Sequence, residues 1–229
     1  MAVLVFDLDD TLYPEKTYVQ SGFRVVASYI AAKRRLSTNV EREIYDYMWN
    51  YLERNGRGKV FDATLRKYQC YSKRFVHGCL VAYRTHQPTL AFYPDAVEML
   101  DRFAGWPMYV ITDGNRHVQR QKMRSLGLYD NMRACFPTYA YGLSARKPAT
   151  ALFHRIAEIE HLPPNQIVYF GDNPNKDFVG VKSEGFRTIR LLRGAFHTLK
   201  VAPVKDADVA IANFQPVTEA WLAAFFQNN

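Results

Sequence analysis

The sequence predicts an α/β fold, in which a parallel β-sheet carries helices on both faces, together with a separate all-helical domain. Residues 2–8 form a short, continuous apolar run, which is typical of a buried parallel strand. From about residue 90 to the end, apolar runs of this kind alternate with helical patterns, as in folds with right-handed crossovers. Between these two parts, only helical periodicity is found.

The segment between the first strand and residue 90 is predicted to be all helical. Apolar residues three and four positions apart predict helices over 17–36, 40–55 and 61–84. Thr38 or Asn39 is suited to cap the second of them. We therefore expect residues 1–14 and 90–229 to form the sheet domain, and 15–89 to form an inserted helical domain.

In the remainder of the chain, strands and helices alternate. We expect strands near 106–114, 135–142, 166–172, 186–192 and 207–214. We expect helices near 95–104, 116–126, 148–161, 176–184 and 216–226. Gly127 and Gly185 directly follow two of these helices and are suited to end them.

Composition narrows the class of protein. With 48% hydrophobic residues, 229 residues can bury a sizeable core. No apolar run approaches the roughly 18–20 residues that span a bilayer. Asp7, Asp9 and Asp10 stand where a secretory signal peptide would have its apolar segment. Cys70, Cys79 and Cys135 form no CxxC pair and leave an odd thiol, which favours a reducing compartment. We expect a cytoplasmic protein with no membrane partner.

The net charge of +8 is concentrated in one segment. Between Glu15 and Arg84 there are 14 Lys or Arg and 6 Asp or Glu, so this segment alone carries the surplus of eight. A basic segment attracts anions. A solvated helical surface explains the same charge, and both interpretations stay open.

The first strand ends on three acids, Asp7, Asp9 and Asp10. Like charges at this spacing repel, and burying them without a partner is costly. We expect Asp10 to hydrogen-bond nearby backbone. Asp7 and Asp9 stand where parallel sheets collect their chemistry, at the carboxyl end of a strand.

Two other predicted strands also end in polar residues. One is followed by Thr112, Asp113 and Gly114, and the other by Gly171, Asp172, Asn173 and Asp177, while Lys147 lies on the loop before a helix. Carboxylates of this kind suit Mg²⁺, which would also offset their mutual repulsion. No His/Cys set has zinc-like spacing, and an EF-hand calcium loop would require Gly where Leu12 stands.

DLDDT (7–11), the Thr of VITDG (110–114), the Lys of ARKP (145–148) and GDNPNKD (171–177) occur in this order. Together they resemble the four signature motifs of the haloacid-dehalogenase-like superfamily. The resemblance covers residues 1–14 and about 90–229 and implies a Rossmann-like α/β core. The helical insert directly after the first motif resembles the mobile cap of one branch of the superfamily.

The resemblance implies a role for each motif residue. Asp7 would be the nucleophile that forms an aspartyl-phosphate, and Asp9 the general acid and then base. Thr112 would hydrogen-bond a phosphoryl oxygen. Lys147 would neutralise charge on Asp7 and the phosphoryl group.

The same resemblance implies the metal and phosphate ligands. Asp172 would hold Mg²⁺ together with Asp7 and the backbone carbonyl of Asp9. Asp177 would orient water or Lys147, or bind the metal secondarily. The backbone N–H groups of Asp113 and Gly114 would donate to phosphate.

The implied function is a magnesium-dependent phosphatase. Its substrate would be a small phosphorylated metabolite: a sugar phosphate, a phosphoglycolate-like acid or a nucleoside monophosphate. The dehalogenase branch lacks the second acid and needs no metal, so Asp9 and Asp172 favour phosphoryl transfer. A phosphomutase with the same site is an open alternative. A catalytically silent scaffold whose basic cap binds a protein or a nucleic acid is another. The sequence contains no nucleic-acid-binding motif, which makes a nucleic acid unlikely as the partner.

Substrate specificity is expected from the cap and from the loop after the second motif. The candidates besides Asp113 and Gly114 are Lys16, Asn115 and Arg116, with Tyr13, Tyr18, Arg24 and Arg120 as further ones. For each, a solvated face or helix packing is the alternative. The sequence indicates no oligomeric state.

Overall fold

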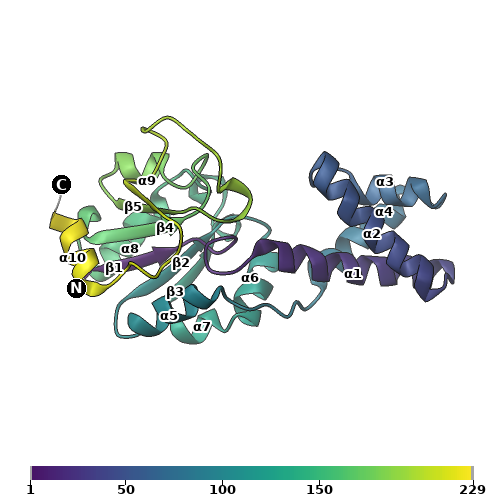
Figure 1. Cartoon of the computed structure of the whole chain (residues 1–229), viewed down its shortest axis with the longest axis horizontal. Coiled ribbons are helices and arrows are strands. Elements are labelled where there is room, and N and C mark those ends of the chain that lie inside the picture. The colour runs from purple at the N-terminus through teal and green to yellow at the C-terminus, as the bar shows by residue number, and fades with distance from the viewer. Residues whose placement is uncertain (1, 228–229) are drawn as a thin grey trace. The chain divides into compact units, whose positions relative to one another are not determined.

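The computed structural model describes residues 2–227 (Figure 1). The chain divides into two compact units. The sheet unit comprises the chain up to Glu15 and from Leu90 onward, and the helical unit is Lys16–Thr89. Glu15, which we had expected in the helical domain, belongs to the sheet unit. Residues 1, 228 and 229 of the predicted sheet domain lie outside the described residues.

The sheet unit contains a six-stranded parallel sheet in the order β3-β2-β1-β4-β5-β6. Its strands are β1 (Val3–Phe6), β2 (Met108–Thr112), β3 (Ala134–Pro137), β4 (Ile167–Gly171), β5 (Arg187–Leu191) and β6 (Val209–Ile211). In β1, Phe6 pairs with Val110 of β2 on one side and with Phe170 of β4 on the other. The three strands that precede the motif residues are therefore neighbours, and their carboxyl ends meet at one edge of the sheet. The predicted α/β fold class is confirmed.

Among the described residues, the sheet unit has six α-helices: α5 (Pro94–Arg102), α6 (Arg116–Ser125), α7 (Leu128–Asn131), α8 (Ala151–Glu160), α9 (Val179–Ser183) and α10 (Glu219–Gln227). The short α7 was not predicted. All four residues of β1 are buried, and because strand side chains alternate between faces, both faces of the sheet must be covered. On one face Val3 and Val5 pack with Leu152 and Ile156 of α8.

The other face is aromatic around the central strands. The rings of Phe6 and Phe170 stack at 5.1 Å between centroids, and the ring of Phe214 meets them edge-on at 6.0 and 5.5 Å. These contacts fix β1 and β4 against the segment after β6. The strand ends that carry the motif residues therefore start from a rigid core.

The helical unit contains α1 (Glu15–Arg34) except for its first residue, α2 (Thr38–Asn55), α3 (Val60–Lys67) and α4 (Lys73–Thr85), drawn in the purple-to-blue part of the chain in Figure 1. The prediction of one helix over 61–84 was wrong. Gln69 takes a left-handed conformation (φ 51°), and Ser72 caps α4 by accepting a hydrogen bond from the backbone N–H of Phe75 at 3.1 Å. The predicted cap of the second helix, Thr38 or Asn39, was wrong: Ser37 stands at the N-cap of α2, and its side chain makes no capping hydrogen bond. No helix among the described residues is long and apolar enough to cross a membrane.

Asp10 is structural, as expected. Its two carboxylate oxygens accept hydrogen bonds from the backbone N–H of Glu15 at 2.9 Å and of Ala195 at 3.2 Å. Gly194 passes so close that a Cβ at its position would lie 2.3 Å from the Asp10 Cβ, and its φ of 68° also favours glycine. Asp10 thus ties the exit from β1 to the turn after β5.

Candidate active site

Three buried carboxylates converge at the carboxyl ends of β1 and β4. Asp7 follows β1, and its backbone N–H extends the ladder by donating to the Phe170 carbonyl at 2.8 Å. Asp172 and Asp177 come from the segment after β4. One oxygen from each of these three side chains lies within 4.8 Å of the other two, and none of the three residues is more than 4% exposed.

A buried lysine reaches into this carboxylate cluster from the loop before α8. Lys147 Nζ donates a hydrogen bond to Asp7 and another to Asp177 at 2.9 Å. Asp177 also accepts from the Tyr169 hydroxyl at 3.1 Å and from the Asn173 backbone N–H at 2.9 Å. Asp177 is therefore held in place on three sides and fixes the ammonium beside Asp7.

The acids of the cluster differ in pKa because their surroundings differ. Burial, together with the neighbouring acids, raises the pKa of Asp7 to about 6 despite Lys147, and that of Asp172 to about 9. Burial would also raise the pKa of Asp177, but the charges of Lys147 and Lys176 outweigh it and lower that pKa. Burial opposes the charged form of Lys147, but Asp177 and Asp7 raise its pKa.

The same donor set fits a hard divalent cation. Such a cation takes oxygen ligands, often one or two carboxylates plus water and phosphate. Among residues 2–227, no cationic side chain forms an ion pair with Asp172, so this carboxylate has the greatest need of added positive charge. Asp7 and Asp172 are the two side chains that would hold the ion.

Asp9 points to a different set of partners. Lys122 Nζ donates to its two oxygens at 2.7 and 2.9 Å, Gln119 Nε2 donates at 2.8 Å, and the Tyr13 hydroxyl donates at 2.5 Å. Burial would raise the pKa of Asp9, but the Lys122 charge and these hydrogen bonds outweigh it and lower that pKa. Asp9 is thus a carboxylate in the resting site, two residues from the less acidic Asp7.

Gln119 also connects Asp9 to the loop after β2. Its Nε2 donates to the Thr112 hydroxyl at 2.9 Å. Asp113 accepts from the Thr138 hydroxyl at 2.6 Å and from the Lys147 backbone N–H at 3.3 Å. The side chain of Asp113 therefore braces the loop, and its backbone carbonyl accepts from Gln119 Nε2 at 2.5 Å. This leaves the backbone N–H of Asp113 as the part suited to a ligand.

The predicted substrate-binding residues fall into two groups. In the sheet unit, Gly114 has a φ of 134°, and Asn115 caps α6 by accepting from the backbone N–H groups of His117 and Val118 at 3.1 and 3.3 Å. Arg116 and Arg120 are exposed on the same helix.

Lys16, Tyr18 and Arg24 belong to the helical unit. The Tyr18 hydroxyl donates to the Tyr83 carbonyl at 3.2 Å, and Tyr18 is buried. The Arg24 guanidinium lies 5.7 Å from the Tyr45 ring centroid. Packing within the helical unit therefore accounts for Tyr18, and the cation–π contact occupies Arg24.

The sequence analysis did not identify three polar residues that the structure places at the site. Gln119 and Lys122 are 2% and 3% exposed, and Lys176 contributes to the charge around Asp7 and Asp177. A signal did exist for the first two. They stand, with Met123 and Leu126, at the i, i+3, i+4 and i+7 positions that face the core on α6, where a glutamine and a lysine are unusual.

The Lys122–Asp9 pair gives a first prediction. In Lys122→Met, the partly buried Asp9 carboxylate, whose side chain is 19% exposed, loses the Lys122 cation, so we expect the free energy of unfolding at pH 7 to fall by about 2 kcal/mol. Because the folded pKa of Asp9 is depressed, the pair stabilises above the ordinary Asp pKa of 3.8 and this contribution is lost as the pH falls below it. The difference between variant and wild type should therefore shrink on acidification. Urea denaturation measures it, with the exposed Arg124→Gln on the same helix as control. Equal losses in both variants would contradict the assignment.

Comparison with known proteins identifies the family. Residues 1–185 match the family model of haloacid dehalogenase-like hydrolases. Two curated relatives are glyceraldehyde 3-phosphate phosphatases: that of Methanopyrus kandleri is 28% identical and the alignment covers 90% of this chain and 89% of the relative. That of Methanocaldococcus jannaschii is 29% identical, with coverage of 86% and 87%.

Among solved structures, the chain is similar to the HAD hydrolase YfnB of Bacillus subtilis, determined with magnesium bound. The TM-score is 0.63 at 16% identity, over 98% of both chains. This likeness concerns the fold, while the family model spans all four motifs. The chain therefore belongs to the haloacid dehalogenase-like hydrolases.

Proposed function

We propose that this hydrolase is a magnesium-dependent phosphatase that acts on a small phosphorylated metabolite through an aspartyl-phosphate. One observation carries the proposal. Asp7 lies in a buried cluster with Asp172, Asp177 and Lys147, while Asp9, two residues on, is a second carboxylate with its own cation. A nucleophile and a separate proton carrier are what phosphoester hydrolysis by way of a covalent intermediate requires.

In the first step an Asp7 oxygen attacks phosphorus, and the bond from phosphorus to the leaving oxygen breaks. The leaving oxygen needs a proton. Since Asp9 is ionised at rest, the proton enters with the phosphate ester, whose second pKa is near 6, and Asp9 relays it to the leaving oxygen. Lys147, hydrogen-bonded to Asp7, neutralises the charge that builds up on the phosphoryl group.

In the second step water attacks phosphorus and restores Asp7. Asp9, again a carboxylate, accepts a proton from this water. Thr112, positioned by Gln119, hydrogen-bonds a phosphoryl oxygen. The backbone N–H groups of Asp113 and Gly114 donate to the other oxygens.

Magnesium would be held by Asp172, Asp7 and the backbone carbonyl of Asp9, with Asp177 outside the ligand set as the partner of Lys147. When bound, the ion supplies positive charge to the phosphoryl oxygens and screens the carboxylates from the substrate. The magnesium-bound homologue YfnB supports this choice of metal.

The helical unit Lys16–Thr89 is proposed to act as a cap that selects the substrate, and Lys16, Asn115 and Arg116 are proposed to contact it. The two archaeal relatives are named for glyceraldehyde 3-phosphate. A short phosphorylated aldose is thus the substrate class to test first.

The test is phosphate release from a panel of phosphorylated metabolites that includes glyceraldehyde 3-phosphate, other sugar phosphates, phosphoglycolate and nucleoside monophosphates. We expect release with Mg²⁺ and none with EDTA. Release that persists in EDTA would exclude the magnesium mechanism. Interconversion of phosphate esters without free phosphate would indicate a phosphomutase.

The pKa of Asp172 leads to a prediction on stability. Folding raises the pKa of Asp172 from 3.8 to about 9. Between these pH values the unfolded chain has lost the Asp172 proton and the folded chain still holds it. The metal-free protein therefore loses stability as the pH rises from 3.8 to about 9. Asp172→Asn should therefore raise the metal-free Tm at pH 7. Mg²⁺ should raise the Tm of the wild type and leave that of the variant unchanged, as measured by calorimetry with Asp130→Asn, an exposed acid, as control. An equal Mg²⁺ response in Asp172→Asn would exclude Asp172 as a ligand.

A further inference from the structure

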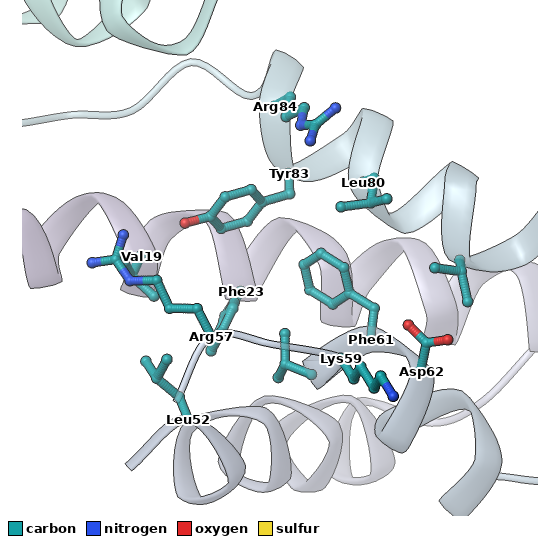
Figure 2. A pocket seen from close by; sticks show the side chains of 12 residues that line it. Val19, Phe23, Leu52, Arg57, Lys59, Phe61, Asp62, Leu80, Tyr83 and Arg84 are labelled. Atoms are coloured by element: carbon teal, nitrogen blue, oxygen red, sulfur yellow. The ribbon is translucent and has the colours of Figure 1, made fainter. Parts of the chain in front are cut away.

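The helical unit has a pocket of about 340 Å³ bounded by α1, α3, α4 and the loop before α3 (Figure 2). Of the described residues that line it, the buried ones are apolar, among them Phe23 and Phe61, and the charged ones are exposed or half-buried. This pocket therefore offers a ligand no buried polar side chain. A buried polar side chain with an unusual set of partners lies in the sheet unit instead, at Gln119.

Gln119 is 2% exposed and lies in the first turn of α6. Three oxygen atoms surround its side-chain nitrogen: Asp9 Oδ2 at 2.8 Å, the Thr112 hydroxyl at 2.9 Å and the Asp113 backbone carbonyl at 2.5 Å. This fixes which end of the amide is which, because a carbonyl oxygen in the same place would face a carboxylate and another carbonyl. One nitrogen atom therefore joins the proposed proton carrier, the proposed phosphoryl ligand and the loop after β2.

The oxygen of the same amide is placed less favourably. Among residues 2–227, no group donates a hydrogen bond to Gln119 Oε1, although this atom is buried. A buried acceptor without a donor is destabilising. An apolar side chain of similar length, such as methionine, would fill the space without this cost. Packing therefore does not explain the glutamine, and the contacts of its Nε2 remain as the reason for it.

The loop after β2 leaves room for this side chain. A Cβ at Gly114 would lie 3.2 Å from Gln119 Nε2 and 3.4 Å from its Cδ, which is closer than such atoms usually approach, and the φ of Gly114 is 134°. The loop can therefore lie against the amide because position 114 is a glycine. The arrangement around Nε2 thus depends on the loop as well as on α6.

The contact with Nε2 also sets the direction of the Thr112 hydroxyl. An amide nitrogen donates hydrogen bonds and accepts none, so the hydroxyl oxygen accepts at this contact and its proton points elsewhere. Thr112 is 1% exposed, and the described part of the chain supplies no acceptor for this proton. The hydroxyl is thereby left as a donor, which is what contact with a phosphoryl oxygen requires.

We propose that Gln119 is a positioning residue for the phosphatase reaction. It holds the Asp9 carboxylate where the proton passes to the leaving oxygen, and it keeps the Thr112 hydroxyl turned toward the phosphoryl group. This inference rests on the proposed function and adds to it a residue that acts through Asp9 and Thr112 rather than on the substrate. It explains why a glutamine stands at a core-facing position of α6.

The test compares two phosphate esters in the variant Gln119→Met. One is the best alkyl phosphate of the panel, whose leaving oxygen needs a proton, and the other is p-nitrophenyl phosphate, whose leaving group is stable without one. The quantity measured is kcat/KM, which reports the first step up to loss of the leaving group. We expect kcat/KM to fall about hundredfold for the alkyl ester and at most about fivefold for the aryl ester. Because both values come from one preparation, any inactive fraction cancels from their ratio.

The matched control is Gln166→Met, the same exchange at an exposed position of the sheet unit. It should leave both values within about twofold of the wild type. In Gln119→Met, the inhibition constant of inorganic phosphate should also rise about threefold, since the Thr112 hydroxyl is free to turn away. An equal loss on the two esters, or no loss on either, would overturn the proposal.

Failure of the proposed function gives a different result from failure of this inference. If the wild type released phosphate from neither ester, the proposed function would fail and the inference with it. If the wild type were active and the two esters responded equally to Gln119→Met, only the inference would fail. Crystal structures of the wild type and of Gln119→Met add a direct check. We expect the Asp9 carboxylate to shift in the variant, and an unchanged position of this carboxylate would contradict the role of Gln119.

Discussion

Asp7→Asn should abolish phosphate release, with a loss in kcat of about four orders of magnitude or more. The amide has nearly the shape of the carboxylate but is a far weaker nucleophile, and it cannot form the acyl phosphate. Asp7 is 3% exposed and lies at the end of a fully buried strand, so the amide is held in the place of the carboxylate. Steady-state phosphate release on the best substrate of the panel measures the effect.

The matched control is Asp101→Asn, a carboxylate-to-amide change at an exposed position of α5. It should retain wild-type activity. Both variants should show wild-type circular dichroism. If folded Asp7→Asn kept more than about one hundredth of the wild-type rate, the nucleophile would have to be another group.

Lys147→Met should lower both stability and activity. The ammonium is 1% exposed and lies between Asp7 and Asp177, so its removal leaves a cluster of buried acids without its nearest cation. We expect the free energy of unfolding at pH 7 to fall by about 4 kcal/mol. We expect kcat to fall by about three orders of magnitude, because the charge on the phosphoryl group is no longer neutralised.

Charge rather than shape should account for this loss, since methionine has nearly the length of lysine. Millimolar Mg²⁺ should therefore recover part of the stability of Lys147→Met, as the ion supplies positive charge to the same carboxylates. Lys200→Met, at an exposed position of the sheet unit, serves as the control. Urea denaturation with and without Mg²⁺ gives the comparison. A loss of stability no greater than that of Lys200→Met would show that the buried ion pair contributes nothing.

The central strands could be predicted because their short apolar runs fit a buried parallel strand and not a helix. LVF, MYVI and IVYF are short apolar runs with β-branched and aromatic residues, and they are followed by Asp, Thr-Asp and Gly-Asp respectively. Since parallel strands of a sheet end at a common edge, the convergence of Asp7, Asp172 and Lys147 was predictable as well. The roles of these residues in catalysis stay a proposal.

The elements that could not be predicted depend on long-range contacts or on single backbone angles. The break between α3 and α4 lies in KYQCYSK, which contains neither glycine nor proline and keeps helical spacing on both sides. The partners of Asp9 were hidden for another reason. The spacing of Gln119 and Lys122 marks them as core-facing on α6, but their partner lies 110 or more positions away, and only the tertiary fold identifies it.

The order of the strands in the sheet has a consequence for synthesis on the ribosome. β1 is made first, but its partners β2 and β4 begin at Met108 and Ile167, so its four apolar residues wait for about 100 further residues, or roughly 5–20 s at usual translation rates. In the meantime the contiguous segment Lys16–Thr89 can fold, because all its helices are already present. The hydrogen bond between the Asp10 side chain and the Ala195 backbone N–H forms later still, after the segment of Ala195 has left the ribosomal exit tunnel. The helical unit can therefore form before the sheet, and the VLVF strand stays unpaired until β2 has been made.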